Sequence, residues 1–97
     1  MRLWVDDLRE PPSPSWVWAQ DSGEAIEALG SLDVEEMSLD HDLGGDDTSR
    51  RVVLWLCCNP DRWPPAVNVH SANPVGRNWL IGMVDRYNPH LQESTGA

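Results

Sequence analysis

Four aspartates occur as two closely spaced pairs, Asp6 with Asp7 and Asp40 with Asp42, and each pair closely follows a short apolar run. Carboxylates that lie close together raise one another's pKa unless a cation lies among them. Oxygen ligands suit hard divalent cations such as magnesium, manganese and calcium. We therefore predict that the four side chains bind a divalent cation, with magnesium and manganese as the first candidates. The alternative is that Asp7 and Asp42 are turn or cap residues bonded to their own backbone.

Two histidines, His41 and His70, adjoin the ends of different apolar runs. A pair of imidazoles can serve as general base and general acid in phosphodiester cleavage, where one proton leaves the nucleophile and another reaches the departing oxygen. We predict that His41 and His70 are catalytic, and the sequence leaves open which one is the base. The alternative is that each is a hydrogen-bonded structural residue. His90 follows the last predicted helix and is not expected to act.

An anion site is predicted where Asn73 and Pro74 open a helix directly after His70. The free N–H groups and the positive end of the helix dipole favour an anion at such a terminus. Arg77 lies one turn into the helix, and its side chain leans toward the N-terminus, where Ser71 can also donate. We predict that Ser71, Asn73 and Arg77 bind phosphate. The alternative for Arg77 is a solvent-facing or aspartate-paired side chain.

The elements that must position these residues follow from hydrophobic spacing and turn signals. Strand-forming runs predict strands at residues 2–5, 16–19, 36–39 and 66–69. Helical spacing and cap signals predict helices at about residues 22–29, 48–58 and 74–87. The predicted N-caps are Asp21, then Asp47 or Thr48, then Asn73. Strands that alternate with helices over short loops predict an open parallel α/β sheet with right-handed crossovers.

The connection between the first two strands, residues 8–15, contains Pro11, Pro12 and Pro14, so we expect the first crossover helix to be missing. Polar, titratable residues follow three of the four predicted strands. Open α/β sheets bind ligands beyond the carboxyl ends of their strands. We therefore expect the functional site at this edge.

The chain has 97 residues, 40% of them apolar, including six tryptophans, which is enough for one core. We expect one domain over residues 1–88 and a flexible tail over residues 89–97. The net charge is −9, and every basic residue is an arginine. Extended binding along a nucleic-acid backbone needs many cationic contacts, so no such groove is expected. A nucleotide or a nucleic-acid end needs only a local pocket.

No apolar run approaches the roughly 20 residues of a membrane span, and the aspartates at residues 6 and 7 interrupt any secretory signal. The two cysteines, Cys57 and Cys58, are adjacent and are not expected to form a structural disulfide. We therefore expect a cytoplasmic protein with no membrane partner. The sequence leaves the oligomeric state open.

Three segments carry a resemblance to known proteins: residues 3–7 (LWVDD), 38–44 (SLDHDLG) and 69–77 (VHSANPVGR). Their strand-ending aspartates and serine resemble the receiver domain of two-component signalling. The two longer segments make the chain more closely similar to the cyclic-phosphate-processing receiver family. The likeness spans about residues 1–87. It implies a minimal receiver-like, flavodoxin-like α/β fold of about four strands and three helices.

The resemblance also implies roles for single positions. The acidic pocket would be formed by Asp6, Asp7 and Asp40. The polar set that this family adds to the receiver would be His41, Asp42, His70, Ser71, Asn73 and Arg77. Signalling receivers pair their phosphorylated aspartate with a lysine on a fifth strand, whereas this chain has no lysine and no predicted fifth strand.

The resemblance and the predicted site together imply a metal-assisted phosphoesterase that opens a cyclic phosphate. Its substrate would be a 2',3'-cyclic RNA end, in an RNA-processing setting, or a small cyclic nucleotide. Two alternatives remain at this point. One is a module that binds a cyclic nucleotide or RNA end without turning it over, and the other is a degenerate signalling receiver.

Overall fold

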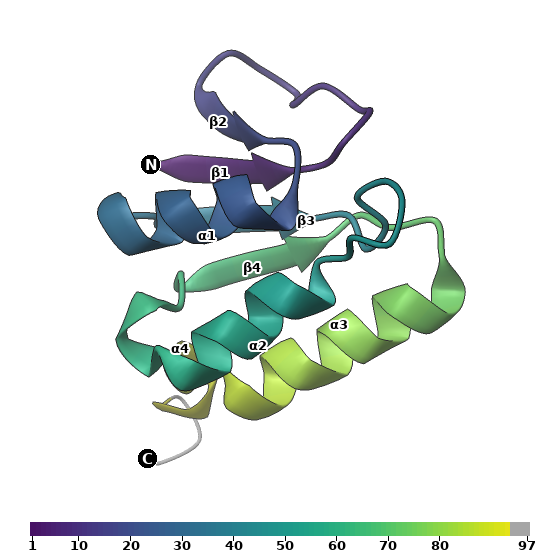
Figure 1. Ribbon diagram of the computed structural model, residues 1–97. Coiled ribbons are helices and arrows are strands. Elements are labelled where there is room, and N and C mark those ends of the chain that lie inside the picture. The colour runs from purple at the N-terminus through teal and green to yellow at the C-terminus, as the bar shows by residue number, and fades with distance from the viewer. Residues whose placement is uncertain (94–97) are drawn as a thin grey trace.

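The computed structural model describes residues 1–93, in which four strands form one parallel sheet in the order β2-β1-β3-β4 (Figure 1). The strands are β1 (Arg2–Val5), β2 (Trp16–Ala19), β3 (Glu36–Leu39) and β4 (Ala66–Val69). All four have the predicted bounds. Short apolar and β-branched runs between strong turn signals explain why these boundaries were readable from the sequence.

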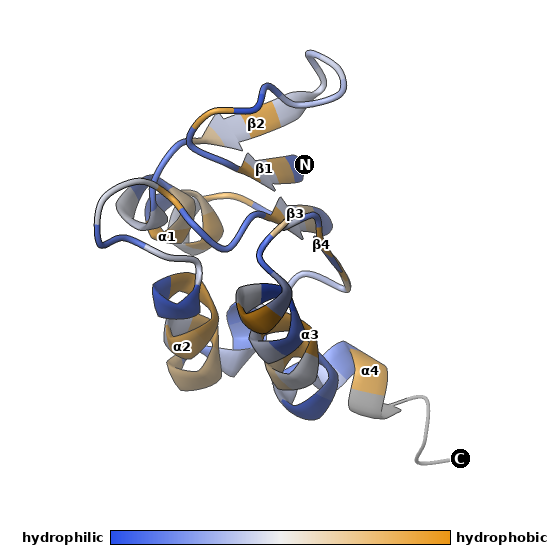
Figure 2. Cartoon of the chain, turned by 90° about the vertical axis from the view of Figure 1, so that its right-hand side faces the viewer, coloured by the Kyte–Doolittle hydropathy of each residue, from blue (hydrophilic) through white to orange (hydrophobic). Residues whose placement is uncertain are grey.

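Three helices lie on one face of this sheet: α1 (Ser22–Ser31), α2 (Arg50–Cys58) and α3 (Pro74–Tyr87) (Figure 2). Asp21 caps α1 by accepting a hydrogen bond from the Glu24 N–H at 2.7 Å, as predicted. Asn73 caps α3 in the same way, with Pro74 in the first turn. Right-handed crossovers that all run in the same direction across a sheet place their helices on one face.

The predicted cap of α2 is wrong. The N-cap position is Ser49 rather than Asp47 or Thr48, and it makes no side-chain cap hydrogen bond. The Ser49 hydroxyl instead donates to the backbone carbonyl of Asp40. Asp47 is used elsewhere, since its carboxylate accepts from both the N–H and the hydroxyl of Ser22 at the start of α1. The side chains near this helix start therefore bind Asp40 and the start of α1 instead of capping α2.

Two short helices were not predicted, η1 (Pro60–Arg62) and α4 (Pro89–Glu93). The helix α4 falls in the segment predicted as a tail. Two contacts hold it against the segment after η1. His90 Nε2 lies 2.9 Å from the Trp63 carbonyl oxygen, and the buried Asn88 side chain donates to the Pro64 carbonyl. Residues 94–97 lie outside the described residues. Within residues 1–93, every helix is too short or too polar to cross a membrane.

The two faces of the sheet differ in what covers them. Leu3 and Val5 of β1 belong to the buried core against the helices, together with Met37 and Leu39 of β3. Trp4, between them, points to the opposite face, where it is in register with Trp18 and Ser38. Residues 6–15 form no helix, as predicted, so no described helix covers that second face (Figure 2). The predicted fold class, an open parallel α/β sheet without its first crossover helix, is confirmed.

Candidate functional site

Three aspartates meet at the carboxyl end of the sheet. Asp6 and Asp7 follow β1, and Asp40 follows β3, its neighbour in the sheet. One carboxylate oxygen from each of the three lies within 4.8 Å of the others. We call Asp6, Asp7 and Asp40 the acidic group. Strand ends in register explain why Asp40 meets residues 33 and 34 positions before it in the chain.

Asp42, the fourth predicted metal ligand, does not join the acidic group. Its side chain is 61% exposed, with one oxygen 2.9 Å from His41 Nδ1 and the other accepting from Asn73 Nδ2 at 3.2 Å. These hydrogen bonds lower the pKa of Asp42, that from His41 most of all. The Asp42 carboxylate therefore joins the segment after β3 to the start of α3.

The pKa of Asp6 is lowered although its side chain is almost fully buried. Burial is the largest influence and raises the pKa of Asp6, but hydrogen bonds from the Arg9 and Leu8 N–H groups and from His70 together lower it further. The two N–H groups donate to Oδ1 at 2.8 and 3.0 Å, and His70 Nε2 lies 3.0 Å from Oδ2. One oxygen of Asp6 is thus used by the backbone, and the other faces His70.

The pKa of Asp40 is shifted in the opposite direction to that of Asp6. Burial and the nearby charge of Asp6 raise the pKa of Asp40, and hydrogen bonds from Ser71 and the His41 N–H offset only part of that increase. The His41 N–H donates to Asp40 Oδ1 at 2.8 Å. A cation among these oxygens would relieve the repulsion between Asp6 and Asp40. The donor set, three carboxylates and no sulfur or imidazole, fits magnesium or manganese.

Gly44 brings a neighbouring loop against the acidic group. Its φ of +89° lies in the left-handed region, and a Cβ at this position would be 3.2 Å from Asp7 Oδ2. A side chain at residue 44 would therefore be strained and would also crowd Asp7.

His70 lies against the acidic group, as predicted. Its ring stacks on Trp4, with centroids 4.0 Å apart and planes 5° from parallel. Nε2 faces Asp6 Oδ2, and Nδ1 lies 2.7 Å from the hydroxyl of Ser38. A carboxylate can only accept a hydrogen bond, so the contact with Asp6 fits a ring that carries a proton on Nε2. The ring is therefore held on three sides, by a carboxylate, a hydroxyl and an aromatic face.

His41 occupies a different environment. It is 6% exposed, its Nδ1 donates to Asp42, and its Nε2 accepts from Arg50 Nε at 3.0 Å. The Arg50 guanidinium in turn lies 4.8 Å from the centre of the Trp79 ring. A Cβ on Gly76 would lie 2.3 Å from the His41 ring, so a glycine is needed for α3 to pack this closely. Both nitrogens of His41 are thus engaged by residues outside the acidic group, and its catalytic role stays a prediction.

The start of α3 offers fewer free donors than predicted. Asn73 Oδ1 accepts the Gly76 N–H at 3.1 Å while its Nδ2 donates to Asp42. Ser71 Oγ accepts the Asn73 N–H at 3.1 Å and also bonds to Asp40. Pro74 has no N–H. Phosphate binding by Ser71 and Asn73 stays a prediction, and it would need one of these hydrogen bonds to exchange.

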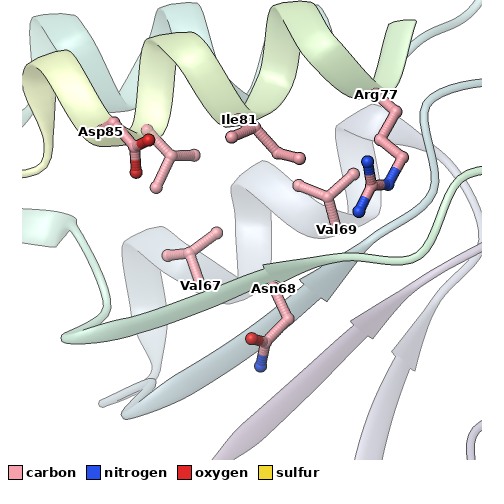
Figure 3. Close-up of a pocket in the computed structure, with 7 residues that line it drawn as sticks. Val67, Asn68, Val69, Arg77, Ile81 and Asp85 are labelled. Atoms are coloured by element: carbon pink, nitrogen blue, oxygen red, sulfur yellow. The ribbon is translucent and has the colours of Figure 1, made fainter. Parts of the chain in front are cut away.

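Arg77 is exposed and lines a cavity of about 260 Å³ between β4 and α3. Figure 3 shows its guanidinium near Val69, with Ile81 farther along the same helix. Among residues 1–93 the guanidinium has no hydrogen bond or ion pair, so its orientation is not fixed by a partner. Its phosphate-binding role stays a prediction that requires the side chain to turn toward the acidic group.

Sequence reasoning missed the residues that hold His70, which are Ser38 and Trp4. Ser38 is 5% exposed and lies on β3 between two core residues. Strand alternation puts Ser38 and Trp4 on the face opposite to the core, and this was the available signal. That His70 would fold back over the same face depended on the tertiary arrangement.

One of three comparisons with known proteins gives a match. A family model described as the cyclic-phosphate processing receiver domain matches residues 1–86. Neither the comparison with curated proteins nor the comparison with solved structures found a match. The matched range includes the acidic group, both histidines discussed above and the first turns of α3.

Proposed function

The chain belongs to the cyclic-phosphate processing receiver family, and we propose that it is a metal-assisted phosphoesterase that opens a cyclic phosphate. The substrate would be a 2',3'-cyclic RNA end or a small cyclic nucleotide. The observation that carries this proposal is the contact between His70 and the acidic group. A proton-transfer group and an oxygen-rich cation site share the side chain of Asp6.

The acidic group is the proposed cation site. Asp6, Asp7 and Asp40 would hold magnesium or manganese, which when bound would neutralise charge that develops on the phosphate oxygens. Asp6 Oδ1 already accepts two backbone N–H groups, and Oδ2 faces His70 Nε2, so a cation would share Oδ2 with His70. Burial and the neighbouring charge of Asp6 raise the pKa of Asp40, and a cation would favour its ionised form, which supports the assignment.

His70 is the proposed proton-transfer residue. When protonated, the ring forms an ion pair with Asp6 and presents its Nε2 proton at the acidic group. A water molecule would attack phosphorus and release a proton to solvent, the ring P–O bond would break, and His70 would donate its Nε2 proton to the departing oxygen. Nδ1 keeps its proton when Nε2 gives its own away, so the Ser38 hydroxyl can accept from Nδ1 before and after the transfer. We therefore assign Ser38 and Trp4 as positioning residues.

His41 would act indirectly in this proposal. Its backbone N–H donates to Asp40, and its ring attaches the segment after β3 to Arg50 and α3. We assign it as a positioning residue for the acidic group. An activity assay on His41 variants separates this role from the direct proton transfer predicted from the sequence.

The proposed function is tested by incubating the protein with an oligonucleotide that ends in a 2',3'-cyclic phosphate and with small cyclic nucleotides. The reactions contain magnesium, manganese or a chelator, and mass spectrometry follows the products. The expected result is addition of one water to the cyclic phosphate, lost with the chelator and in Asp7→Asn. A substrate that stays intact under all conditions would refute the phosphoesterase proposal.

One observation favours a second candidate, a module that binds a cyclic phosphate without turnover. Both ring nitrogens of His70 already have hydrogen-bond partners. In that case the same reactions would show a stable stoichiometric complex and no product. Labelling of Asp40 by acetyl phosphate would instead indicate a degenerate signalling receiver, for which the missing lysine is unfavourable.

A further inference from the structure

A second cavity, of about 410 Å³, lies between β2 and the loop that replaces the first crossover helix. It is lined by Glu10, Pro11, Pro12, Ser13, Pro14 and Trp18. None of these residues belongs to the acidic group or to the predicted polar set. The cavity exists because residues 8–15 form a proline-rich loop instead of a helix.

This cavity adjoins the acidic group in two ways. The Trp18 indole N–H donates to the backbone carbonyl of Asp6 at 2.7 Å, so one edge of the ring reaches the residue that anchors the acidic group. On the loop side, the Arg9 N–H is 2.8 Å from Asp6 Oδ1 and Glu10 is the next residue. The spacing of consecutive Cα atoms then puts the Glu10 Cα within about 8 Å of the Asp6 carboxylate.

The start of the loop is held in place by several hydrogen bonds. The Leu8 and Arg9 N–H groups both bond to the Asp6 carboxylate, and the Trp4 indole N–H donates to the Arg9 carbonyl at 2.8 Å. Three prolines restrict the backbone beyond this point. A ligand would therefore meet a largely formed wall rather than a loop that it must order, which lowers the entropic cost of binding.

The chemistry of the lining selects a neutral, flat ring. An indole and three pyrrolidine rings offer apolar surfaces, and aromatic faces stack well on nucleobases. Glu10 adds a carboxylate that can accept hydrogen bonds from N–H groups, and Ser13 adds a hydroxyl. No arginine lines the cavity, and an acidic side chain there disfavours a phosphate.

We propose that this cavity binds the nucleobase of the substrate whose cyclic phosphate lies at the acidic group. The inference rests on the proposed function and narrows it. It assigns the base of the nucleotide substrate to this cavity, with the ribose bridging the acidic group and the cavity, so that the base contributes to binding. Trp18 supplies the stacking surface, and Glu10 accepts hydrogen bonds from the base.

The test compares two substrates, a nucleoside 2',3'-cyclic phosphate and 1-O-methylribose 2',3'-cyclic phosphate, which lacks the base. The unmodified protein should show a lower KM for the nucleoside substrate. Trp18→Leu should raise that KM by about 5- to 160-fold, the range expected for loss of one base-aromatic stack. The KM for the base-free substrate should stay unchanged. The base-free substrate is the internal control, because damage transmitted through Asp6 would alter both reactions.

Two variants separate stacking from structural effects. Trp18→Phe removes the N–H that donates to Asp6 but keeps an aromatic face, so it should retain the preference for the nucleoside substrate. Trp16→Leu is the matched control, since Trp16 lies on the same strand but does not line the cavity. It should change the two KM values by the same factor.

Equal KM values in the unmodified protein, or an equal rise for both substrates in Trp18→Leu, would overturn the inference and leave the proposed function standing. If neither substrate is turned over, calorimetric binding of the nucleoside cyclic phosphate decides the matter. Weaker binding to Trp18→Leu than to the unmodified protein supports the nucleobase site even though the phosphoesterase proposal has failed. Equal or undetectable binding to both proteins overturns it.

Discussion

His41 and His70 show how two similar pairs in the sequence reach different environments. Each histidine follows a strand, and each bonds to an aspartate. His41 is packed under α3, where Arg50 and Gly76 complete its contacts. His70 stacks on Trp4, which points to the sheet face opposite the core, and lies against the acidic group. A histidine–aspartate pair therefore does not define a catalytic residue; the groups around the pair decide what its proton can do.

The largest expected effect is a loss of turnover when His70 is replaced. His70→Ala should lower turnover of a cyclic-phosphate substrate by about 10² to 10⁴, the usual contribution of general acid–base catalysis. The fold should persist, because the His70 ring lies outside the hydrophobic core. Steady-state kinetics and circular dichroism measure the two quantities. His90→Ala is the control, and unchanged turnover in His70→Ala would remove His70 from the mechanism.

The next prediction concerns the packing around His41. Gly76→Ala should lower the free energy of unfolding by about 1–3 kcal/mol, because a Cβ 2.3 Å from the buried ring forces a shift of the ring or of α3. Denaturant titration measures the loss. Gly82→Ala, in the same helix, is the control, since a Cβ there meets nothing within 4 Å. Equal stability of the two variants would mean that α3 does not need its close approach to His41.

A double variant tests the contact between Gly76 and the His41 ring directly. His41→Ala alone should cost about 1–3 kcal/mol of stability, because it removes the hydrogen-bond partner of Arg50 and leaves a void. In that background, Gly76→Ala should cost less than it does alone, since the ring that the new methyl group would meet is gone. Unfolding titrations of the four proteins give the coupling energy. Additive losses would contradict the direct contact.

The smallest expected effect comes from the acidic group and depends on pH. The pKa of Asp40 is raised on folding, so the folded state binds more protons and stability falls as pH rises from the usual aspartate pKa through the raised one. The pKa of Asp6 is lowered, so its contribution has the opposite sign and is lost as pH falls through that lower value. At neutral pH without metal, Asp40→Asn should therefore raise the melting temperature slightly.

Magnesium provides the matched measurement for Asp40. It should raise the melting temperature of the unmodified protein at neutral pH, because a ligand that binds only the folded state stabilises it. The increase should be much smaller in Asp40→Asn, and Asp46→Asn should behave like the unmodified protein. An equal magnesium shift in all three proteins would show that the acidic group is not the cation site.

The sequence predicted the elements more completely than the side-chain contacts. The bounds of all four strands and of α3 follow from local signals, such as Asn73 and Pro74 at the start of a helix. The helix α4 was missed because it depends on long-range contacts, including that of His90 with Trp63. The cap of α2 was misplaced because Ser49 and Asp47 bond to other segments. Local patterns carry no information about such distant partners.

What the sequence determined by itself was the edge at which Asp6, Asp7 and Asp40 meet, because parallel strands bring their carboxyl ends to one side. The tertiary structure decided which polar residues reach that edge. It directed Asp42 to His41 and Asn73, and it placed His70 between Ser38 and Asp6. The physical reason is that strand order and backbone direction follow from short-range patterns, whereas hydrogen-bond partners depend on packing between segments far apart in the chain.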